Sequence, residues 1–387
     1  TDAHTPPHME NKRTDNMQEE AGGKQNYDDD DEGTVTDGIS NSDRNHNERK
    51  EGHAKLPSDT EKGECKEEVP TMLQPDTDEI KGLEKAFILY KISKIDQAFK
   101  QIESLKNSSV VVTATGETRQ KISEIRSAHA QMIRTRELLG DTNGWRCVVD
   151  NHKEISTYHR QEEGTPIHSI KVVGIIEAPL QHLLSLIIEA DLIPTFINFI
   201  TIIVDQLKVN SPYHQILYSR VPLPWPLDDR DVIINAQGFD LLDEFGEIVI
   251  SATSVKEFPD TKIPEVPPKC TRLEIHLAGA RIKPITMNKI ELTAVANVDF
   301  KSFLPSSVIN WLAKTLAYYF FLQFRAKAAS SSGNGPHYDR VNEKKEMYTQ
   351  VMGPIIEYFR NKGDTCEQEI ARTETKNEAV DVAVNGG

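Results

Sequence analysis

Between Trp145 and Phe300, hydrophobic residues recur at every second position in a series of short segments. The clearest segment, Lys289 to Phe300, alternates apolar residues with charged or polar ones, so one face of it is apolar. This period is that of a β-strand with one buried face. Turn-forming residues separate the segments, which predicts strands near residues 145–150, 153–160, 167–177, 201–209, 213–221, 231–241, 247–256, 270–283 and 288–300.

The segment after these strands is apolar on nearly every side. It reads SSVINWLAKTLAYYFFLQFRAKA from Ser306 to Ala328, and Pro305 before it favours a helix start. Asn310, Lys314 and Gln323 would be costly at bilayer depth, which argues against a membrane-spanning helix. A helix that is apolar all round is buried on more than one side. We therefore expect an α+β fold in which a curved antiparallel sheet closes around this helix, with residues 179–199 helical.

Two amphipathic helices are predicted before the strands. One apolar stripe has 4-3-4-3 spacing, typical of a single helix face, and consists of Ile88, Ile92, Ile95, Phe99 and Ile102. A second helix follows a break at residues 107–116 and ends at Gly140-Asp141, with a stripe of Ile122, Ile125, Met132 and Leu139. Packing against the body fits both stripes, and so does pairing in a helical hairpin or dimer, which leaves open a protein partner for residues 80–139.

A linker at residues 330–335 follows the long apolar helix. A further helix is expected over residues 338–359, broken at Gly353-Pro354 because proline removes a helical hydrogen bond and clashes with the preceding turn.

Negative charge is concentrated at the two ends of the chain. Residues 1–79 contain 9 Lys and Arg against 22 Asp and Glu, and residues 363–387 contain 2 against 6. Both segments are predicted to be disordered acidic tails. Residues 80–362 are almost neutral, with 34 basic against 32 acidic residues, so they offer no obvious basic face for nucleic acid. Apolar cargo suits such a body better.

The four cysteines, at positions 65, 147, 270 and 366, form no C-x-x-C pair, and no secretory segment precedes them. We expect reduced thiols and a cytoplasmic protein. Motifs for metal, nucleotide or hydrolase chemistry are missing from the sequence, so we expect no cofactor, no metal site and no catalytic residue.

One loop between predicted strands has an unusual composition. Residues 221–231 read VPLPWPLDDRD, and three prolines limit the conformational freedom that the loop would lose on docking. An indole prefers the bilayer interface, so Trp225 is predicted to contact membranes, together with Leu223, Pro224 and Leu227. Inward packing of Trp225 as a cap on the core is the alternative. Arg230 and Asp231 are predicted to be a structural pair at the loop base.

These motifs together resemble the START domain, the steroidogenic acute regulatory protein-related lipid transfer family. The resemblance covers about residues 118–328. It is carried by Trp145 after a helix, by Trp225-Pro226 followed by Arg230-Asp231, by Ser254-Val255 after a strand, and by VDFKSFLPSSVINWL at 298–312. It implies the helix-grip fold, with a tunnel for one lipid under the last long helix. The remaining parts are then a helical segment at 80–117, a linker and helix at 329–362, and the two tails.

The resemblance also implies which residues face the lipid. The tunnel-lining set is Leu217, Ser219, Ile234, Ala236, Ile275, Leu292, Ala294, Val308, Leu312, Thr315 and Tyr319. Sterol-type members carry an acid and an arginine at positions that correspond here to Leu217 and Ala236, so headgroup recognition would fall to other residues, with Gln215, Ser219, His276 and Arg281 as candidates. The loop around Trp225 would lie beside the tunnel mouth.

The function that these features predict is lipid carriage, not chemistry. The chain would shelter one lipid of unknown class and exchange it with membranes, touching them transiently from the cytoplasm. Two other classes stay open: a helix-grip enzyme of the cyclase type, which needs acids and bases in its pocket, and a scaffold that recruits partners through its helical and acidic segments.

Overall fold

The computed structural model describes residues 76–151, 154–301, 304–330 and 334–362. The chain divides into two units, Thr1–Val69 and Pro70–Gly387, and every described residue belongs to the second. Residues 1–75 and 363–387, which make up nearly all of the two predicted tails, lie outside the described part, as do Cys65 and Cys366. Cys147 and Cys270 are free thiols.

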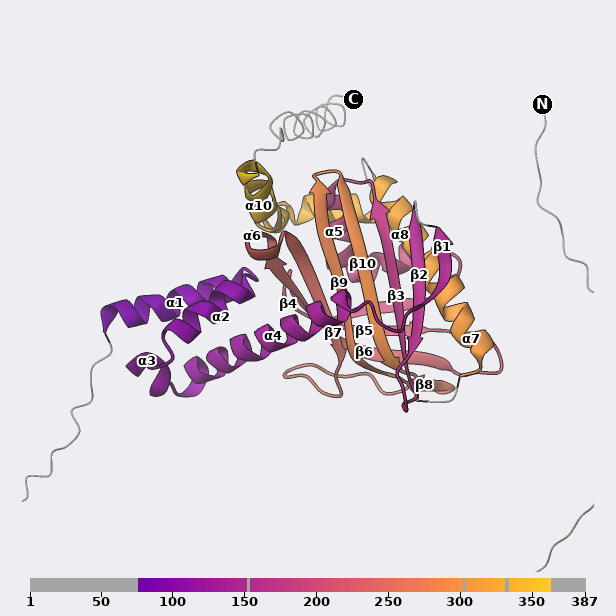
Figure 1. Ribbon diagram of the computed structural model, residues 1–387, viewed down its shortest axis with the longest axis horizontal. Coiled ribbons are helices and arrows are strands. Elements are labelled where there is room, and N and C mark those ends of the chain that lie inside the picture. The colour runs from indigo at the N-terminus through magenta and orange to yellow at the C-terminus, as the bar shows by residue number, and fades with distance from the viewer. Residues whose placement is uncertain (1–75, 152–153, 302–303, 331–333, 363–387) are drawn as a thin grey trace, which may run out of the picture. The chain divides into compact units, whose positions relative to one another are not determined.

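A ten-stranded sheet forms the centre of the described part (Figure 1). Nine strands run antiparallel to their neighbours, in the order β1 (Arg146–Asn151), β2 (Ile155–Gln161), β3 (Ile167–Ile176), β10 (Lys289–Asp299), β9 (Glu274–Thr286), β7 (Glu247–Ser254), β6 (Asp229–Leu241), β5 (His214–Val221) and β4 (Ile203–Ser211). The short β8 (Cys270–Arg272) pairs in parallel with β6. The predicted strands are confirmed to within a few residues, except that 270–283 divides into β8 and β9.

The long apolar helix lies against the inner face of the sheet. It consists of α7 (Ser306–Trp311), the π-helical segment η2 (Leu312–Ala317) and α8 (Tyr318–Ser330). Beside it on the same face lie α5 (Leu180–Ile188) and the 3-10 helix η1 (Ala190–Thr195), and in Figure 1 both α5 and α8 appear behind the sheet. Gly174 of β3 makes the approach possible, because a Cβ there would lie 2.6 Å from Cζ of Phe321. The predicted α+β helix-grip fold is confirmed.

The helix α4 (Gly116–Gly140) covers the outer face of the sheet over β7, β9 and β10. Its predicted stripe is buried, and Gly279 of β9 again permits close packing, because a Cβ there would lie 2.4 Å from Cγ2 of Thr135. The hydroxyl of Thr135 donates to Ser251 Oγ of β7 at 2.7 Å. The histidine on this helix, His129, stacks on Phe99 and contacts Asp96, so it serves packing.

The prediction of one helix over Ile88 to Ile102 is wrong. The chain forms α1 (Thr77–Lys91) and α2 (Ile95–Ser104) with a turn between them, followed by the short α3 (Ser109–Val112). As a result, Ile88 is 62% and Ile92 is 41% exposed, while Ile95 and Ile102 are buried. Ser93 turns the chain with a φ of 68° and is held by β6, because its carbonyl accepts from Asp240 N at 3.0 Å.

The last described helices also differ from the prediction. The segment 338–359 lies in two helices, α9 (Pro336–Glu343) and α10 (Lys345–Asn361), and α10 continues through Gly353-Pro354 without a break. Proline removes one helical hydrogen bond, but Val351, Met352 and Ile355 around it are buried against the core and keep the helix in place. Among the described residues, no helix has the length and apolar character needed to cross a bilayer.

Candidate functional site

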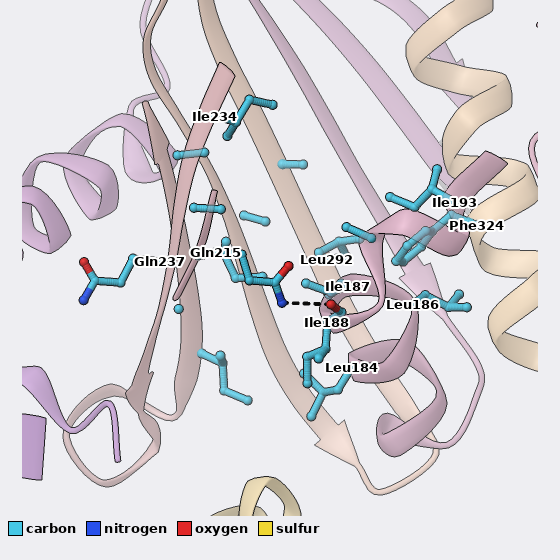
Figure 2. Close-up of a pocket in the computed structure, with 18 of the residues that line it drawn as sticks. Leu184, Leu186, Ile187, Ile188, Ile193, Gln215, Ile234, Gln237, Leu292 and Phe324 are labelled. Carbon is cyan, nitrogen blue, oxygen red and sulfur yellow. Dashed lines mark hydrogen bonds between the residues drawn. The ribbon is translucent and has the colours of Figure 1, made fainter. Parts of the chain in front are cut away.

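A cavity of about 630 Å³ lies between the inner face of the sheet and the helices that cover it (Figure 2). Residues of six strands form the sheet side of the wall, most of them at alternate positions, among them Val172, Leu217, Ala236, Ile250 and Leu292. The helical side comes from α5, η1, the long apolar helix and α10, with Leu184, Ile188, Ile193, Leu316 and Phe324 among its residues. The period-two pattern explains why the sheet side of the wall is apolar. In each strand every second side chain, which is the apolar set, points toward the helices.

The wall is almost entirely apolar. Among the described residues that line it, none is a lysine, arginine or histidine, and the polar side chains belong to Tyr213, Gln215, Gln237 and Asp240. Figure 2 shows the Gln237 side chain pointing away from the cavity. A negatively charged headgroup inside would therefore lack a counter-ion from this wall, and burying an unpaired charge is costly.

Gln215 is a buried polar residue of the wall, and its amide is used by the fold. Its Nε2 donates to the Ile188 carbonyl at 2.8 Å, a bond drawn in Figure 2, and its Oε1 accepts from Gln206 Nε2 at 2.9 Å. Gln206 donates to the same carbonyl at 2.8 Å. The two glutamines thus tie β4 and β5 to the end of α5, which positions the α5 side chains over the cavity.

Asp240 and Tyr213 form a small polar corner of the wall. Asp240 Oδ1 accepts from Leu242 N at 3.1 Å, while Oδ2 is buried without a hydrogen-bond partner among the described residues. Burial raises the pKa of Asp240, because water no longer solvates the carboxylate. Burial, with Asp240 nearby, also raises the pKa of Tyr213.

One end of the cavity is closed by a cluster of apolar side chains, which we name the apolar plug. Its buried members are Val298, Phe300, Leu304, Ile309 and Leu312. Leu223 and Leu227 of the loop between β5 and β6 pack on the plug, whereas Trp225 between them is 92% exposed. The loop therefore directs its two leucines at the plug and its indole into solvent, and Trp225 does not cap the core.

Arg230 and Asp231 lie at the base of this loop and are buried. They face different partners, because neighbouring residues of a strand point to opposite sides. The Arg230 guanidinium donates to the carbonyls of Phe300 (3.2 Å) and Asp228 (2.6 Å). The Asp231 carboxylate accepts a hydrogen bond from Nη2 of Arg272 at 2.6 Å and forms an ion pair with it. Both residues therefore hold the base of the loop. Arg230 does so through Phe300 of the plug, and Asp231 through Arg272 of β8.

The opposite end of the cavity is closed by α10. Val351, Pro354 and Ile355 of this helix contribute to the wall. The helix is anchored by Glu189, which follows α5 and is fully buried. The Glu189 carboxylate accepts hydrogen bonds from Arg340 Nη1 (2.9 Å), Lys344 Nζ (2.8 and 2.9 Å) and Tyr348 Oη (3.0 Å). We name these four residues the Glu189 cluster.

The predicted lining residues fall in two groups. Leu217, Ile234, Ala236, Leu292, Ala294 and Leu312 lie in the wall, and both positions that carry charges in sterol-type members, Leu217 and Ala236, are apolar there. The others lie elsewhere among the described residues: Ile275 and Val308 pack with the plug, Tyr319 is 48% exposed, and Ser219 and Thr315 are partly buried outside the wall. The space beside Ile275 and Val308 is filled by the plug, whereas the half-exposed Tyr319 lies on a helix face that does not line the cavity.

The residues predicted to recognise a headgroup also differ in whether they line the cavity. Gln215 lies in the wall, whereas His276 and Arg281 do not. His276 is beside Glu274, and Arg281 faces Thr293 (3.4 Å) and Glu291 (3.9 Å) on β10. Sequence reasoning predicted a helix over residues 338–359 but missed that α10 contributes to the cavity wall. Its apolar stripe at Tyr348, Val351, Ile355 and Phe359 signalled a buried helix, but not what the helix would cover.

Comparison with known proteins agrees with this geometry. The START domain family model matches residues 125–331, more than half of the chain. No curated protein sequence matches.

Solved structures that match this chain include human STARD10, which is 20% identical over 51% of this chain and 77% of that chain, with a TM-score of 0.43. Human StAR-related lipid transfer protein 5 is 18% identical, over 52% of this chain and 95% of that chain, with a TM-score of 0.42. The lipid transfer and protein localization domain of human StarD13 is 15% identical, over 52% and 96%, with a TM-score of 0.38. On the family match, this chain belongs to the START domain family.

Proposed function

We propose that this protein binds one lipid in the cavity and exchanges it with membranes. The observation that carries the proposal is a large apolar cavity in a START domain, between the sheet and its long helix. At ~30 Å³ for a water-sized group, the volume holds about 20 such groups. This is the size of a single acyl chain or of another compact lipid, on the approximation that a methylene is as large as a water molecule.

The energetics favour transfer through direct membrane contact. Burial gains about 0.8 kcal/mol per methylene, so a lipid of this size would lose on the order of ten kcal/mol on entering water. Passage from a bilayer to an apolar cavity avoids this loss because both environments are apolar. The loop around Trp225 is suited to make the contact, since its indole is exposed and interfaces attract indoles. Outward movement of the loop would withdraw Leu223 and Leu227 from the plug.

We further propose that the cavity carries its ligand without converting it. Acid–base catalysis needs positioned proton donors and acceptors, and in the described wall the ionisable side chains are Asp240 and Tyr213 alone. Incubation with a loaded lipid followed by mass analysis of the extract tests this point. A changed mass would favour the cyclase-type alternative.

A donor-to-acceptor liposome assay tests the main proposal. Ala317→Phe places a ring in the cavity wall, whereas Ala326→Phe adds the same ring at an exposed position of the same long helix. The wild type and Ala326→Phe are expected to transfer lipid, and Ala317→Phe to lose at least about tenfold in rate, since fewer methylenes fit. Transfer by folded Ala317→Phe at the wild-type rate would refute the cavity as carrier. Binding without transfer by the wild type would favour lipid sensing by a scaffold.

A further inference from the structure

The end wall formed by α10 lies outside the region that the START family model matches. The match ends at residue 331, and α10 begins at Lys345. Nevertheless Val351, Pro354 and Ile355 contact the same cavity as the strands of the START fold. A segment beyond the matched region therefore contributes to the shape of the site.

The position of α10 along the cavity follows from the sheet. Wall residues of β6 run from Ile234 to Asp240, a length of about 20 Å at ~3.3 Å per residue. The plug closes the end near the start of β6, where the Trp225 loop enters that strand. At the other end, α10 contacts α6 (Leu242–Phe245), the turn that directly follows β6, and Figure 1 shows α10 beside α6. The helix thus closes one end of the long direction.

The helix is held rigidly enough to act as a wall. The Glu189 cluster joins it to the end of α5, and a buried carboxylate that loses such partners is strongly destabilised. Tyr348 and Phe359 are buried at 1% exposure, and burial beside Glu189 raises the pKa of Tyr348, which keeps its hydroxyl a donor. At its far end, Tyr358 contacts the α6 turn, because its Oη would lie 2.8 Å from a Cβ on Gly246.

We propose that α10 sets the length of lipid that the cavity accepts, with Ile355 and Val351 as specificity-determining residues. The inference rests on the proposed function, since it concerns the cargo of the same cavity. A smaller side chain at position 355 lengthens the space in the direction of the sheet strands. A larger side chain shortens it.

Loading of the full chain with a series of monoacylglycerols of increasing acyl length, read by native mass spectrometry, tests this assignment. Ile355→Ala frees the volume of about three methylene-sized groups at ~30 Å³ each, so the preferred acyl length should rise by about two or three carbons. Each methylene that newly enters is worth about 0.8 kcal/mol, or about fourfold in relative loading. Ile355→Phe should shift the preference to shorter chains.

Met352→Ala is the matched control, because Met352 is buried on the same helix but is not in the wall. It should leave the preferred length unchanged. Equal shifts in Met352→Ala and Ile355→Ala would point to general loosening of the core and overturn the inference, as would unchanged preferences in both Ile355 variants and in Val351→Ala. A wild-type protein that loads none of the series, nor any lipid from liposomes, would refute the proposed function itself.

Discussion

The two ends of the cavity are closed by different physical means. At the loop end, Leu223 and Leu227 rest on an apolar plug, so the contacts that hold the end shut are apolar ones. At the other end, one buried carboxylate accepts four hydrogen bonds, from Arg340 of α9, from Lys344 just before α10 and from Tyr348 of α10, and so fixes the start of α10. A bilayer can replace apolar contacts when the loop moves into it, but it offers a buried carboxylate no comparable partners.

This difference indicates which end opens. The loop end can separate from the plug while Arg230 and Asp231 keep its base attached to Phe300 and Arg272. Opening at α10 would leave the buried Glu189 carboxylate without its hydrogen-bond donors, or would expose Tyr348 and Phe359 to solvent. We therefore expect exchange at the loop end and a fixed wall at the α10 end.

Removal of the carboxylate should have the largest effect on stability. Glu189→Ala leaves Arg340, Lys344 and Tyr348 without their common acceptor, and disruption of a buried ion pair costs about 4 kcal/mol. The free energy of unfolding from urea titration measures this loss. Glu154→Ala, which removes a half-exposed partner of Arg325, is the control and should cost about 0.5 kcal/mol. Similar losses in both variants would show that the cluster does not fix α10.

Acid should weaken the same end of the cavity through His337. This residue of α9 is 1% exposed and packs edge-on against Phe196, and burial, with Lys327 nearby, lowers its pKa to about 4. The unfolded chain, with a histidine pKa of 6.5, binds the proton more strongly. The contribution of neutral His337 to the free energy of unfolding is therefore complete above pH 6.5. As the pH falls toward 4 this contribution is lost, which lowers the free energy of unfolding by up to about 3 kcal/mol.

His337→Leu separates this effect from the titration of other groups. Between pH 7 and pH 4 the unfolding free energy of the wild type should fall relative to that of the variant by up to about 3 kcal/mol, because only the wild type has His337 to protonate. Parallel curves over this range would mean that His337 is not held in its neutral form.

The smallest effect on stability is expected at the loop end. Trp225→Ala should change the free energy of unfolding by less than about 0.5 kcal/mol, because the indole is almost fully exposed. It should retain bound lipid but exchange it several-fold more slowly with liposomes. Phe245→Ala removes an exposed aromatic ring of α6, near the α10 end, and should leave the rate unchanged. Equal rates for wild type and Trp225→Ala would place membrane contact elsewhere.

Much of the fold was predictable because its signals are local. Alternation along β10 predicted both the strand and its apolar face, and the all-round apolar character of residues 306–328 predicted a helix gripped by a sheet. The turn at Ser93 was not predictable in this way. No glycine or proline marks it, and its left-handed backbone is held by a hydrogen bond to Asp240, 147 positions away in the chain.

The cavity wall shows the same limit. The resemblance to START domains placed Ala294, Val308 and Ile275 alike on the cavity side, yet Ala294 lines a void while the other two pack in the plug. The spacing of apolar residues in the sequence indicates only which side of its strand or helix a residue occupies. Whether the space on that side is filled depends on side chains that arrive from other elements.

The sequence alone therefore determined the order of the elements, the inward and outward faces of the strands, and the resemblance to the START family, because each depends on neighbouring residues and on short motifs. Only the tertiary structure decided where the interior is hollow, that α10 closes one end of it, and that Glu189 anchors that helix. These features arise from contacts between segments about 150 residues apart, such as Glu189 and Arg340, and no local pattern encodes which distant partner a buried side chain will meet.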